Sequence, residues 1–479
     1  MISLRHLWLG IGGHPWGAGH LPDEPLPAVV VDSRKAVPGS VFFALRGEHR
    51  DGHEFVADAF ARGAVAAVVS QEVEGVDRPV YTHEVGIRDP FEPPVLFRVP
   101  DTSQALLRAG GYWRAHFHPR VVGVTGSVGK TSTKEMIAAV LRRRFRTLWT
   151  PASYNNEIGI PLTLLRLGPE HEALVVEMGA YLPGDIDSLC HYTFPQVGVV
   201  TNVGVSHLER MGSVERIWEA KSELVRFLPR DGTAVLNWDD EGVRRMARVT
   251  RARVFSYGLT PEADLWADEV ETLGLEGIRF TLHHGRDVVP VRLPILGRHS
   301  VHTALAAAAV GLVFGLEWED ILAGLGDPDA EVRIVVVPGI KGTQIVDDTY
   351  NASPASMLAA LNLLADLDGR RVAILGDMLE LGSYEEVGHR KVGARAAEVV
   401  DRLIAVGERA RWIAEEAIAA GMPPEHVAHV STVEEAIEKA REWLQPGDII
   451  LIKASRAMAL ERVVEALSAP EEETSQLEG

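Results

Sequence analysis

The chain has 479 residues, of which 46% are hydrophobic and 24% charged, with a formal net charge of −19. The length predicts about three globular domains. The acidic balance disfavours a broad nucleic-acid interface, which needs clustered Lys and Arg, and no apolar run is long enough for membrane insertion. The single cysteine, Cys190, excludes an intramolecular disulfide and a Cys-rich zinc site. Since the opening residues are also too Gly-broken for a secretory signal, we expect a cytoplasmic protein.

Residues 1–117 are predicted to form a first, small α/β domain. Strands are expected in VVVDSR, SVFFAL, AVAAVVS and PVLFRV, and helices in HEFVADAFARG and DTSQALLRAGGYW, with Asp101 as the cap of the second helix. Asp32, Ser33 and Arg34 directly follow an apolar run. They form either a turn with a local salt bridge or a polar cluster for an anionic ligand, and the residues alone favour neither interpretation.

The second predicted domain, residues 118–328, opens with VVGVTGSVGKTSTKE. An apolar strand leads into a Gly-rich turn and then into a helix that begins at Lys130. Backbone N–H groups of such a loop, with the positive end of the helix dipole, bind phosphate oxygens. Lys130 would reach the β- and γ-phosphates and the Thr131 hydroxyl would bind Mg²⁺, although Val124 stands where the strict motif has glycine. The alternative is a Gly-rich turn without a ligand.

Two further apolar runs of this domain end in polar residues. ALVVEMG carries Glu177, and VGVVTNVGVSH carries Asn202 and His207. Ligands of parallel sheets bind beyond the carboxyl ends of the strands, so Glu177 and His207 are expected beside the phosphate loop. Carboxylate oxygen is a preferred ligand of Mg²⁺, which makes Glu177 a candidate metal ligand. A helix cap or an ion pair is the alternative for Glu177, and a lone histidine is more often structural.

The helix SVERIWEAKSELVRFL carries a lysine on its apolar stripe, Lys221, four residues after Ile217 and three before Leu224. Only eight of the 48 basic residues are lysine, so a lysine among apolar neighbours suggests a role that arginine cannot fill. Desolvation lowers the pKa of such an amine, and a neutral amine can add carbon dioxide to form a metal-binding carbamate. A snorkelling or Glu-paired lysine is the alternative.

Residues 329–466 are predicted to form a Rossmann-like, doubly wound domain, and residues 467–479 an acidic flexible tail. Strand signals in TQIVDD, RVAILGD, DRLIAVG and DIILIKASR alternate with helical signals in SPASMLAALNLLADL, YEEVGHRKVGARAAEVV and STVEEAIEKAREWL. Polar residues at the strand ends predict a shared ligand surface: Asp347, Asp348, Asp377 and Lys453. The predicted class is α/β with three domains, in which a mostly parallel sheet forms the central P-loop ATPase domain.

Together these features resemble the Mur ligase family over nearly the whole chain. The segments that carry the resemblance are VDSRKAVPGSVFFALRG, GVTGSVGKTSTKE, NNEIGIP, VVEMGA, TNVGVSHLERMGS with EAKSEL, VDDTYNASP, ILGDMLELG and IKASR. The resemblance implies an ATP-dependent amide ligase of peptidoglycan precursor synthesis, with ATP as co-substrate and two Mg²⁺ ions. DDTYNASP and GDMLELG favour the member that adds D-alanyl-D-alanine to UDP-N-acetylmuramoyl-tripeptide through an acyl phosphate.

The resemblance also implies residue roles. The residues expected to bind ATP are Gly126, Ser127, Val128, Gly129, Lys130, Thr131, Ser132 and, at the ribose, Asp348. Those expected to bind metal are Thr131, Glu177, His207 and carbamylated Lys221. Those expected to act in catalysis are Lys130, Glu177, His207 and Lys221. Those expected to bind the UDP-muramoyl substrate or build the closed site are Asp32, Ser33, Arg34, Asn155, Asn156, Tyr350 and Asn351.

Some positions depart from the family pattern, and two alternatives stay open. Ser300 and His302 stand where asparagine is frequent, which leaves the adenine contacts open. One alternative is a neighbouring amide ligase, either another Mur ligase or a folylpolyglutamate synthetase-like enzyme. The other is a P-loop ATPase switch without ligation, which would leave Lys221 and the GDMLELG segment unused. We expect a monomer.

Overall fold

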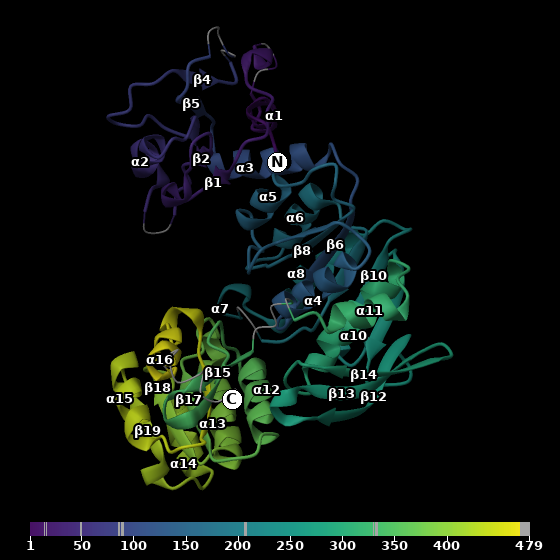
Figure 1. Cartoon of the computed structure of the whole chain (residues 1–479), viewed down its shortest axis with the longest axis vertical. Helices are drawn as coiled ribbons and strands as arrows, with labels where there is room; N and C mark the ends of the chain where they lie inside the picture. The colour runs from purple at the N-terminus through teal and green to yellow at the C-terminus, as the bar shows by residue number, and fades with distance from the viewer. Residues whose placement is uncertain are drawn as a thin grey trace, which may run out of the picture. The chain divides into compact units, whose positions relative to one another are not determined.

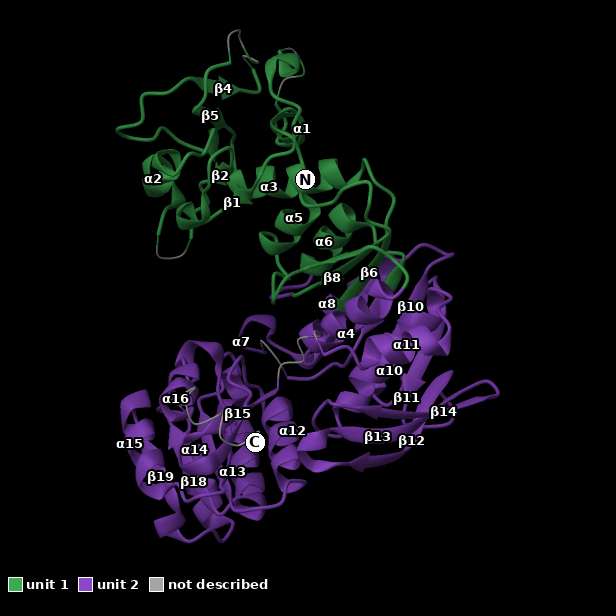
Figure 2. Ribbon diagram, in the orientation of Figure 1, with its two compact units in different colours: residues 1–124, 144–179, 184–197 green, residues 125–143, 180–183, 198–479 purple. Residues whose placement is uncertain are grey.

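The computed structural model describes residues 1–13, 15, 17–47, 50–84, 87, 91–205, 208–328, 330 and 334–469. The chain divides into two compact units, coloured green and purple in Figure 2. Unit 1 comprises residues 1–124, 144–179 and 184–197, and unit 2 comprises residues 125–143, 180–183 and 198–479. Within the described ranges, every helix is too short or too polar to cross a bilayer.

The described residues form three sheets of mostly parallel strands, which confirms the predicted α/β class. The short 3₁₀ helices that connect the elements are η1 (Ala18–His20), η2 (Ser33–Lys35), η3 (Gly52–Phe55), η4 (Met246–Arg248), η5 (Gly274–Glu276), η6 (Ile340–Gly342), η7 (Gly382–Tyr384), η8 (Pro424–His426) and η9 (Arg456–Met458).

Unit 1 contains a parallel sheet of order β1-β2-β3-β5-β4. Its strands are β1 (Val29–Val30), β2 (Val41–Phe43), β3 (Ala66–Val69), β4 (Val80–Thr82) and β5 (Val95–Arg98), and the nearby helices are α1 (Leu4–Gly10), α2 (Val56–Ala61) and α3 (Thr102–Arg114). Every residue of β2 and β3 is buried, as expected for a parallel sheet covered on both faces. Asp101 caps α3 as predicted, since its side chain accepts from the Gln104 N–H at 2.9 Å.

One predicted strand of this unit is shorter than expected. The strand expected over residues 29–34 ends at Val30, and η2 begins at Ser33. The Asp32 side chain accepts a hydrogen bond from the Arg34 N–H at 3.0 Å, which turns the chain out of the extended conformation.

Unit 1 also contains the parallel strands β6 (Arg120–Thr125), β8 (Ala173–Glu177) and β7 (Thr147–Trp149), paired in that order. Only the last residue of β6, Thr125, belongs to unit 2. Its remaining helices are α5 (Gly159–Leu164) and α6 (Asp185–Thr193). All residues of β8 are buried, including its last residue, Glu177. The carboxyl ends of β6 and β8 lie side by side, because Val124 is paired with Glu177.

The first half of unit 2 carries the remaining strands of this second sheet, in the order β14-β13-β12-β11-β10-β9. The strands are β9 (Val197–Val200), β10 (Thr233–Asn237), β11 (Arg253–Gly258), β12 (Leu265–Thr272), β13 (Ile278–His284) and β14 (Asp287–Leu293). The helices are α4 (Lys130–Arg142), α7 (Leu208–Met211), α8 (Val214–Phe227), α9 (Glu241–Arg245), α10 (Ser300–Val313) and α11 (Trp318–Leu325). The pairs β12–β13 and β13–β14 are antiparallel. Residues 304–310 of the Ala-rich helix α10 are all buried.

The second half of unit 2 is a six-stranded sheet of order β15-β16-β20-β17-β18-β19. Its strands are β15 (Val335–Gly339), β16 (Thr343–Asp347), β17 (Arg371–Gly376), β18 (Arg402–Val406), β19 (Val427–Val430) and β20 (Ile449–Lys453). Its helices are α12 (Pro354–Ala365), α13 (Glu385–Val399), α14 (Arg411–Ala419), α15 (Val433–Trp443) and α16 (Glu461–Leu467). Only β15 runs antiparallel among these described strands, so the predicted doubly wound pattern is present (Figure 1).

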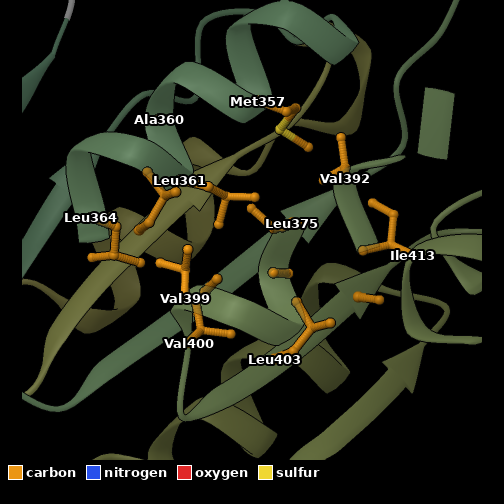
Figure 3. Packing of buried hydrophobic residues seen from close by; sticks show 14 of the residues in the cluster. Met357, Ala360, Leu361, Leu364, Leu375, Val392, Val399, Val400, Leu403 and Ile413 are labelled. Atoms are coloured by element: carbon orange, nitrogen blue, oxygen red, sulfur yellow. The ribbon is translucent and has the colours of Figure 1, made fainter. Parts of the chain in front are cut away.

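Two hydrophobic clusters cover the faces of this sheet. α12, α13 and α14 pack on one face, where Leu361, Leu375 and Leu403 are fully buried (Figure 3). α15 and α16 contribute to the cluster on the other face, with Ile374 and Ile452. Burial on both sides explains why these strands read as continuous apolar runs.

Candidate active site

The predicted phosphate loop, Gly126–Gly129, connects β6 to α4. Gly129 has a φ of 80° and immediately precedes the first helical residue, Lys130. The first N–H groups of a helix have no partner within the helix, and with the helix dipole they favour an anion. The local structure is therefore that of a phosphate-binding loop.

The segment that follows β9 fixes the shape of this loop. Thr201 Oγ1 and Asn202 Nδ2 donate to the Val128 carbonyl at 2.7 and 2.9 Å, and Asn202 Oδ1 accepts from the Val128 N–H at 2.9 Å. Ser127 Oγ donates to the Gly204 carbonyl at 3.0 Å and accepts from its N–H at 2.9 Å. The role of Thr201 was not predicted from the sequence, although its position at the end of an apolar run was a usable signal.

Replacing Gly126 by alanine is predicted to lower kcat/KM for ATP about a hundredfold. A loss of that size is expected when the reacting groups are misplaced by about 1 Å. A Cβ atom there would lie 1.9 Å from Thr201 Oγ1, at a φ of 151°. Gly129→Ala is the matched control, since its φ is also positive but its Cβ would meet no atom within 4 Å. Equal losses in the two variants would contradict the prediction.

Lys130 and Thr131 begin α4 beside this loop. Lys130 Nζ donates to the Gly126 carbonyl at 2.9 Å and to the Ser127 carbonyl at 3.3 Å, so its ammonium group lies against the loop. Thr131 is buried, with 6% of its surface exposed. A fixed cation and a hydroxyl at these two positions suit a bound phosphate and its metal ion.

Lys221 is buried in α8 and reaches the same loop. It is 3% exposed, and its Nζ donates to the Gly126 carbonyl at 3.0 Å. Burial lowers the pKa of this amine well below its ordinary value, and the nearby Lys130 lowers it further. The apolar stripe predicted this burial correctly, because Ile217 and Leu224 of the same face are also fully buried. A lowered pKa raises the neutral, nucleophilic fraction of an amine, and the carbamate on Lys221 stays a prediction.

Glu177 and Asn155 form a hydrogen-bonded pair in unit 1. Asn155 Nδ2 donates to Glu177 Oε1 at 2.8 Å, and the Glu177 N–H donates to Thr150 Oγ1 at 3.1 Å. Asn156 has a local role, since its Oδ1 accepts from two N–H groups at the start of α5, those of Ile158 and Gly159. The carboxylate is held at the carboxyl end of β8, where ligands of parallel sheets bind.

Glu177 and Asn155 belong to unit 1, whereas the phosphate loop and Lys221 belong to unit 2. That the residues of both units bind one and the same ligand stays a prediction. His207 lies outside the described residues. Among the residues that the structure describes, no three His, Cys, Asp or Glu side chains form a metal-binding group.

Asp32 and Arg34 form a local salt bridge, as in the first of the two interpretations of this turn. Arg34 Nε and Nη2 donate to the two carboxylate oxygens of Asp32 at 2.9 and 2.8 Å. The hydrogen bond from Arg34 lowers the pKa of Asp32 to about 2. The side chain of Arg34 is 80% exposed and Ser33 is buried. Contact of these three residues with a substrate stays a prediction.

The carboxyl ends of β16 and β20 bring a second polar group together in unit 2. Lys453 Nζ lies 2.6 Å from Asp348 Oδ2 and donates to the Asn351 carbonyl at 2.8 Å. Lys453 is 2% exposed. The guanidinium of Arg456 lies 5.5 Å from the ring centre of Tyr350. The two strands are parallel neighbours, which explains why the residues that follow them meet at one edge.

The fold and the loop define an α/β protein that binds a nucleotide phosphate. Family models match three parts of the chain: "Mur ligase family, catalytic domain" over residues 27–93, "Mur ligase middle domain" over residues 124–311, and "Mur ligase, glutamate ligase domain" over residues 332–456. The chain belongs to the Mur ligase family.

Named relatives are similar to this chain over nearly its full length. The UDP-N-acetylmuramoyl-tripeptide–D-alanyl-D-alanine ligase of Bacillus subtilis is 36% identical, covering 92% of both chains, and that of Escherichia coli K12 is 36% identical, covering 97% and 98%. A crystal structure of MurF from Acinetobacter baumannii has a TM-score of 0.82 at 31% identity, covering 97% of this chain and 98% of that one. MurF from Thermotoga maritima, solved with ADP, has a TM-score of 0.76 at 29% identity, covering 93% and 98%.

Proposed function

We propose that this chain is an ATP-dependent amide ligase that adds D-alanyl-D-alanine to UDP-N-acetylmuramoyl-tripeptide in peptidoglycan precursor synthesis. The observation that carries this proposal is the near full-length similarity to relatives of that name at 36% identity. The phosphate loop with Lys130 supports the use of ATP, and the ADP complex of the Thermotoga maritima relative agrees with it. We place the reaction in the cytoplasm and expect a monomer.

The reaction proceeds in two steps. The terminal carboxylate of the tripeptide attacks the γ-phosphorus of ATP, the bond to the β–γ bridging oxygen breaks, and an acyl phosphate and ADP form. The amine of D-alanyl-D-alanine then attacks the acyl carbon, loses a proton, and displaces inorganic phosphate to leave an amide. In phosphoryl transfer the protein mainly positions groups and neutralises charge. Lys130 provides a fixed positive charge where a carboxylate must approach a triphosphate.

The chemistry of the residues present fits magnesium, although among the described residues no three His, Cys, Asp or Glu side chains form a metal-binding group. Mg²⁺ is usually held by one or two carboxylates together with substrate phosphates and water. Thr131 and Glu177 would supply oxygen ligands of this kind, and His207 and a carbamate on Lys221 would complete a second site. When bound, Mg²⁺ neutralises the phosphate charge that develops during transfer. Asn155 orients the Glu177 carboxylate through its amide.

Glu177→Gln is predicted to raise the Mg²⁺ concentration needed for half-maximal activity about tenfold or more. Metal affinity typically falls by this factor when a ligand, or a residue that orients a ligand, is replaced. Glutamine keeps the volume of this fully buried side chain and can still accept from Asn155, but it carries no negative charge. The measurement is a magnesium titration of ADP release at saturating substrates. Glu172→Gln is the control, because Glu172 lies one residue before the same strand, half-exposed, and pairs with Arg146. An unchanged magnesium requirement in Glu177→Gln would contradict the assignment.

The domain limits are part of the same proposal. We assign residues 1–117 to UDP-muramoyl-peptide binding, residues 118–328 to ATP binding and residues 329–466 to the C-terminal ligase domain. The three family-model matches agree with this order, since none of them crosses a proposed limit. The domain boundaries near residues 118 and 328 would act as hinges when the domains close around the bound substrates.

An ADP-release assay over a panel of acceptors tests the function. UDP-muramoyl-tripeptides with diaminopimelate or lysine as third residue, UDP-muramoyl-dipeptide and a folate are each incubated with ATP, with and without D-alanyl-D-alanine. We expect rapid release only with a tripeptide and D-alanyl-D-alanine together. Release with the dipeptide or folate would favour a neighbouring amide ligase. Full release without any acceptor amine would favour an ATPase switch.

A further inference from the structure

His389 is a fully buried histidine that the reaction described above does not use. It lies on α13 with no exposed surface. Its Nδ1 is 2.7 Å from the Glu385 carbonyl, and its Nε2 is 3.0 Å from the backbone nitrogen of Met378. A carbonyl only accepts and a backbone N–H only donates, so the proton is on Nδ1 and Nε2 is an acceptor. The geometry therefore requires a neutral imidazole with one defined tautomer.

The residue that His389 holds, Met378, belongs to the loop Asp377–Gly382, which follows β17. Two further residues of this loop are also held by hydrogen bonds. Asp377 Oδ1 accepts from the Ala410 N–H at 2.7 Å, and the Leu379 N–H donates to Ser455 Oγ at 2.9 Å. Glu380 has a φ of 63°, a conformation that a residue with a side chain adopts at a cost. A strained loop keeps its shape only when its surroundings over-determine it, and the bond from Met378 to His389 is one of those constraints.

The loop meets α7 within unit 2. The Glu209 N–H of α7 donates to the Glu380 carbonyl at 3.2 Å, and a Cβ on Gly382 would lie 3.1 Å from the Glu209 Cα atom. α7 begins one residue after His207 and is joined through Gly212 and Ser213 to α8, which carries Lys221. A shift of the loop would therefore be passed to the chain segment that carries two of the proposed metal ligands.

We propose that His389 is a positioning residue for the ligase reaction, which holds the loop Asp377–Gly382 in the shape that fixes α7. This inference rests on the proposed function. The role requires neutral imidazole, because a protonated Nε2 would place a donor against the Met378 N–H. Burial lowers the pKa of His389 and Arg409 lowers it further, whereas the Glu385 carbonyl, Asp377 and the Glu385 carboxylate raise it, with a net lowering. The ring centre of Trp412 lies 5.8 Å from that of His389. Protonation as pH falls below the ordinary histidine range therefore releases the loop.

Two substitutions separate this role from simple packing. In His389→Gln the side-chain carbonyl reaches about as far as Nε2 and can still accept from the Met378 N–H. In His389→Asn the shorter amide can reach the Glu385 carbonyl in its own helix but not Met378. We expect His389→Asn to lower kcat roughly tenfold, the effect of one unmade buried hydrogen bond, and His389→Gln to stay within about threefold of the wild type. Because glutamine does not titrate, the acid limb of the pH profile should lie at lower pH in His389→Gln than in the wild type.

The experiment measures kcat and KM for all three substrates between pH 5 and 8, and backbone hydrogen exchange of the loop and α7, in the full-length chain. Faster exchange of residues 377–382 and 208–211 in His389→Asn, with normal exchange in His389→Gln, supports the proposal. Equal kinetics and exchange in the two variants would overturn it. If His389→Asn does not fold, His389→Gln decides: near wild-type kcat with a shifted acid limb supports the role, and a large loss refutes it. A wild-type chain without D-alanyl-D-alanine-dependent ADP release would instead refute the proposed function, whatever the exchange data show.

Discussion

Lys221→Ala should lower kcat for ADP release about a hundredfold or more, the typical cost of removing a group that stabilises transition-state charge. The Lys221 amine is 3% exposed, contacts the phosphate loop through the Gly126 carbonyl, and has a pKa well below its ordinary value because of burial. It is thus a buried nucleophilic amine beside the predicted triphosphate. If its carbamate binds metal, a small carboxylate such as acetate should enter the space left in the alanine variant and restore part of the activity.

Two further variants at this position test the carbamate separately from the packing. Lys221→Met keeps most of the volume and removes the buried amine, so it should fold at least as stably as the wild type but stay inactive. Lys221→Arg keeps a positive charge but cannot form a carbamate and should also be inactive. Full activity of Lys221→Arg, or the absence of rescue by any short carboxylate, would contradict the carbamate role.

Lys130→Ala should lower kcat/KM for ATP about a thousandfold, because it removes a positive charge that is held against the predicted phosphate loop. In the structure the ammonium group donates hydrogen bonds to the Gly126 and Ser127 carbonyls, so it lies directly against the loop. The measurement is steady-state ADP release over a range of ATP concentrations, together with direct nucleotide binding by calorimetry.

Lys439→Ala is the control for this variant. Lys439 lies on the polar face of α15 and pairs with Glu442 at 2.6 Å, an exposed pair that contributes little to stability. Its loss should leave kcat/KM unchanged. A Lys130→Ala variant with normal ATP affinity and turnover would show that the loop binds no phosphate.

Much of the fold could be predicted because it follows from local patterns. The alternation of strands and helices in the C-terminal part predicted a doubly wound sheet, and the apolar stripe of α8 predicted the burial of Lys221. Polar residues after β16 and β20 meet, as the rule for parallel strand ends requires.

Other features depend on contacts that no local pattern reveals. The turn at Asp32 ends a predicted strand because a single side chain captures the Arg34 N–H. Thr201 holds the phosphate loop from a distant part of the sequence. His389 looks like an ordinary residue of an amphipathic helix, and its bond to Met378 exists only because α13 packs against the end of β17.

A crystal structure with Mg²⁺ and a non-hydrolysable ATP analogue tests the central claim most directly. The account predicts the triphosphate on residues 126–132, with Glu177 and His207 as metal ligands and extra density for a carboxyl group on Lys221 Nζ. A triphosphate bound elsewhere, or Glu177 and Lys221 Nζ far from it, would contradict the account.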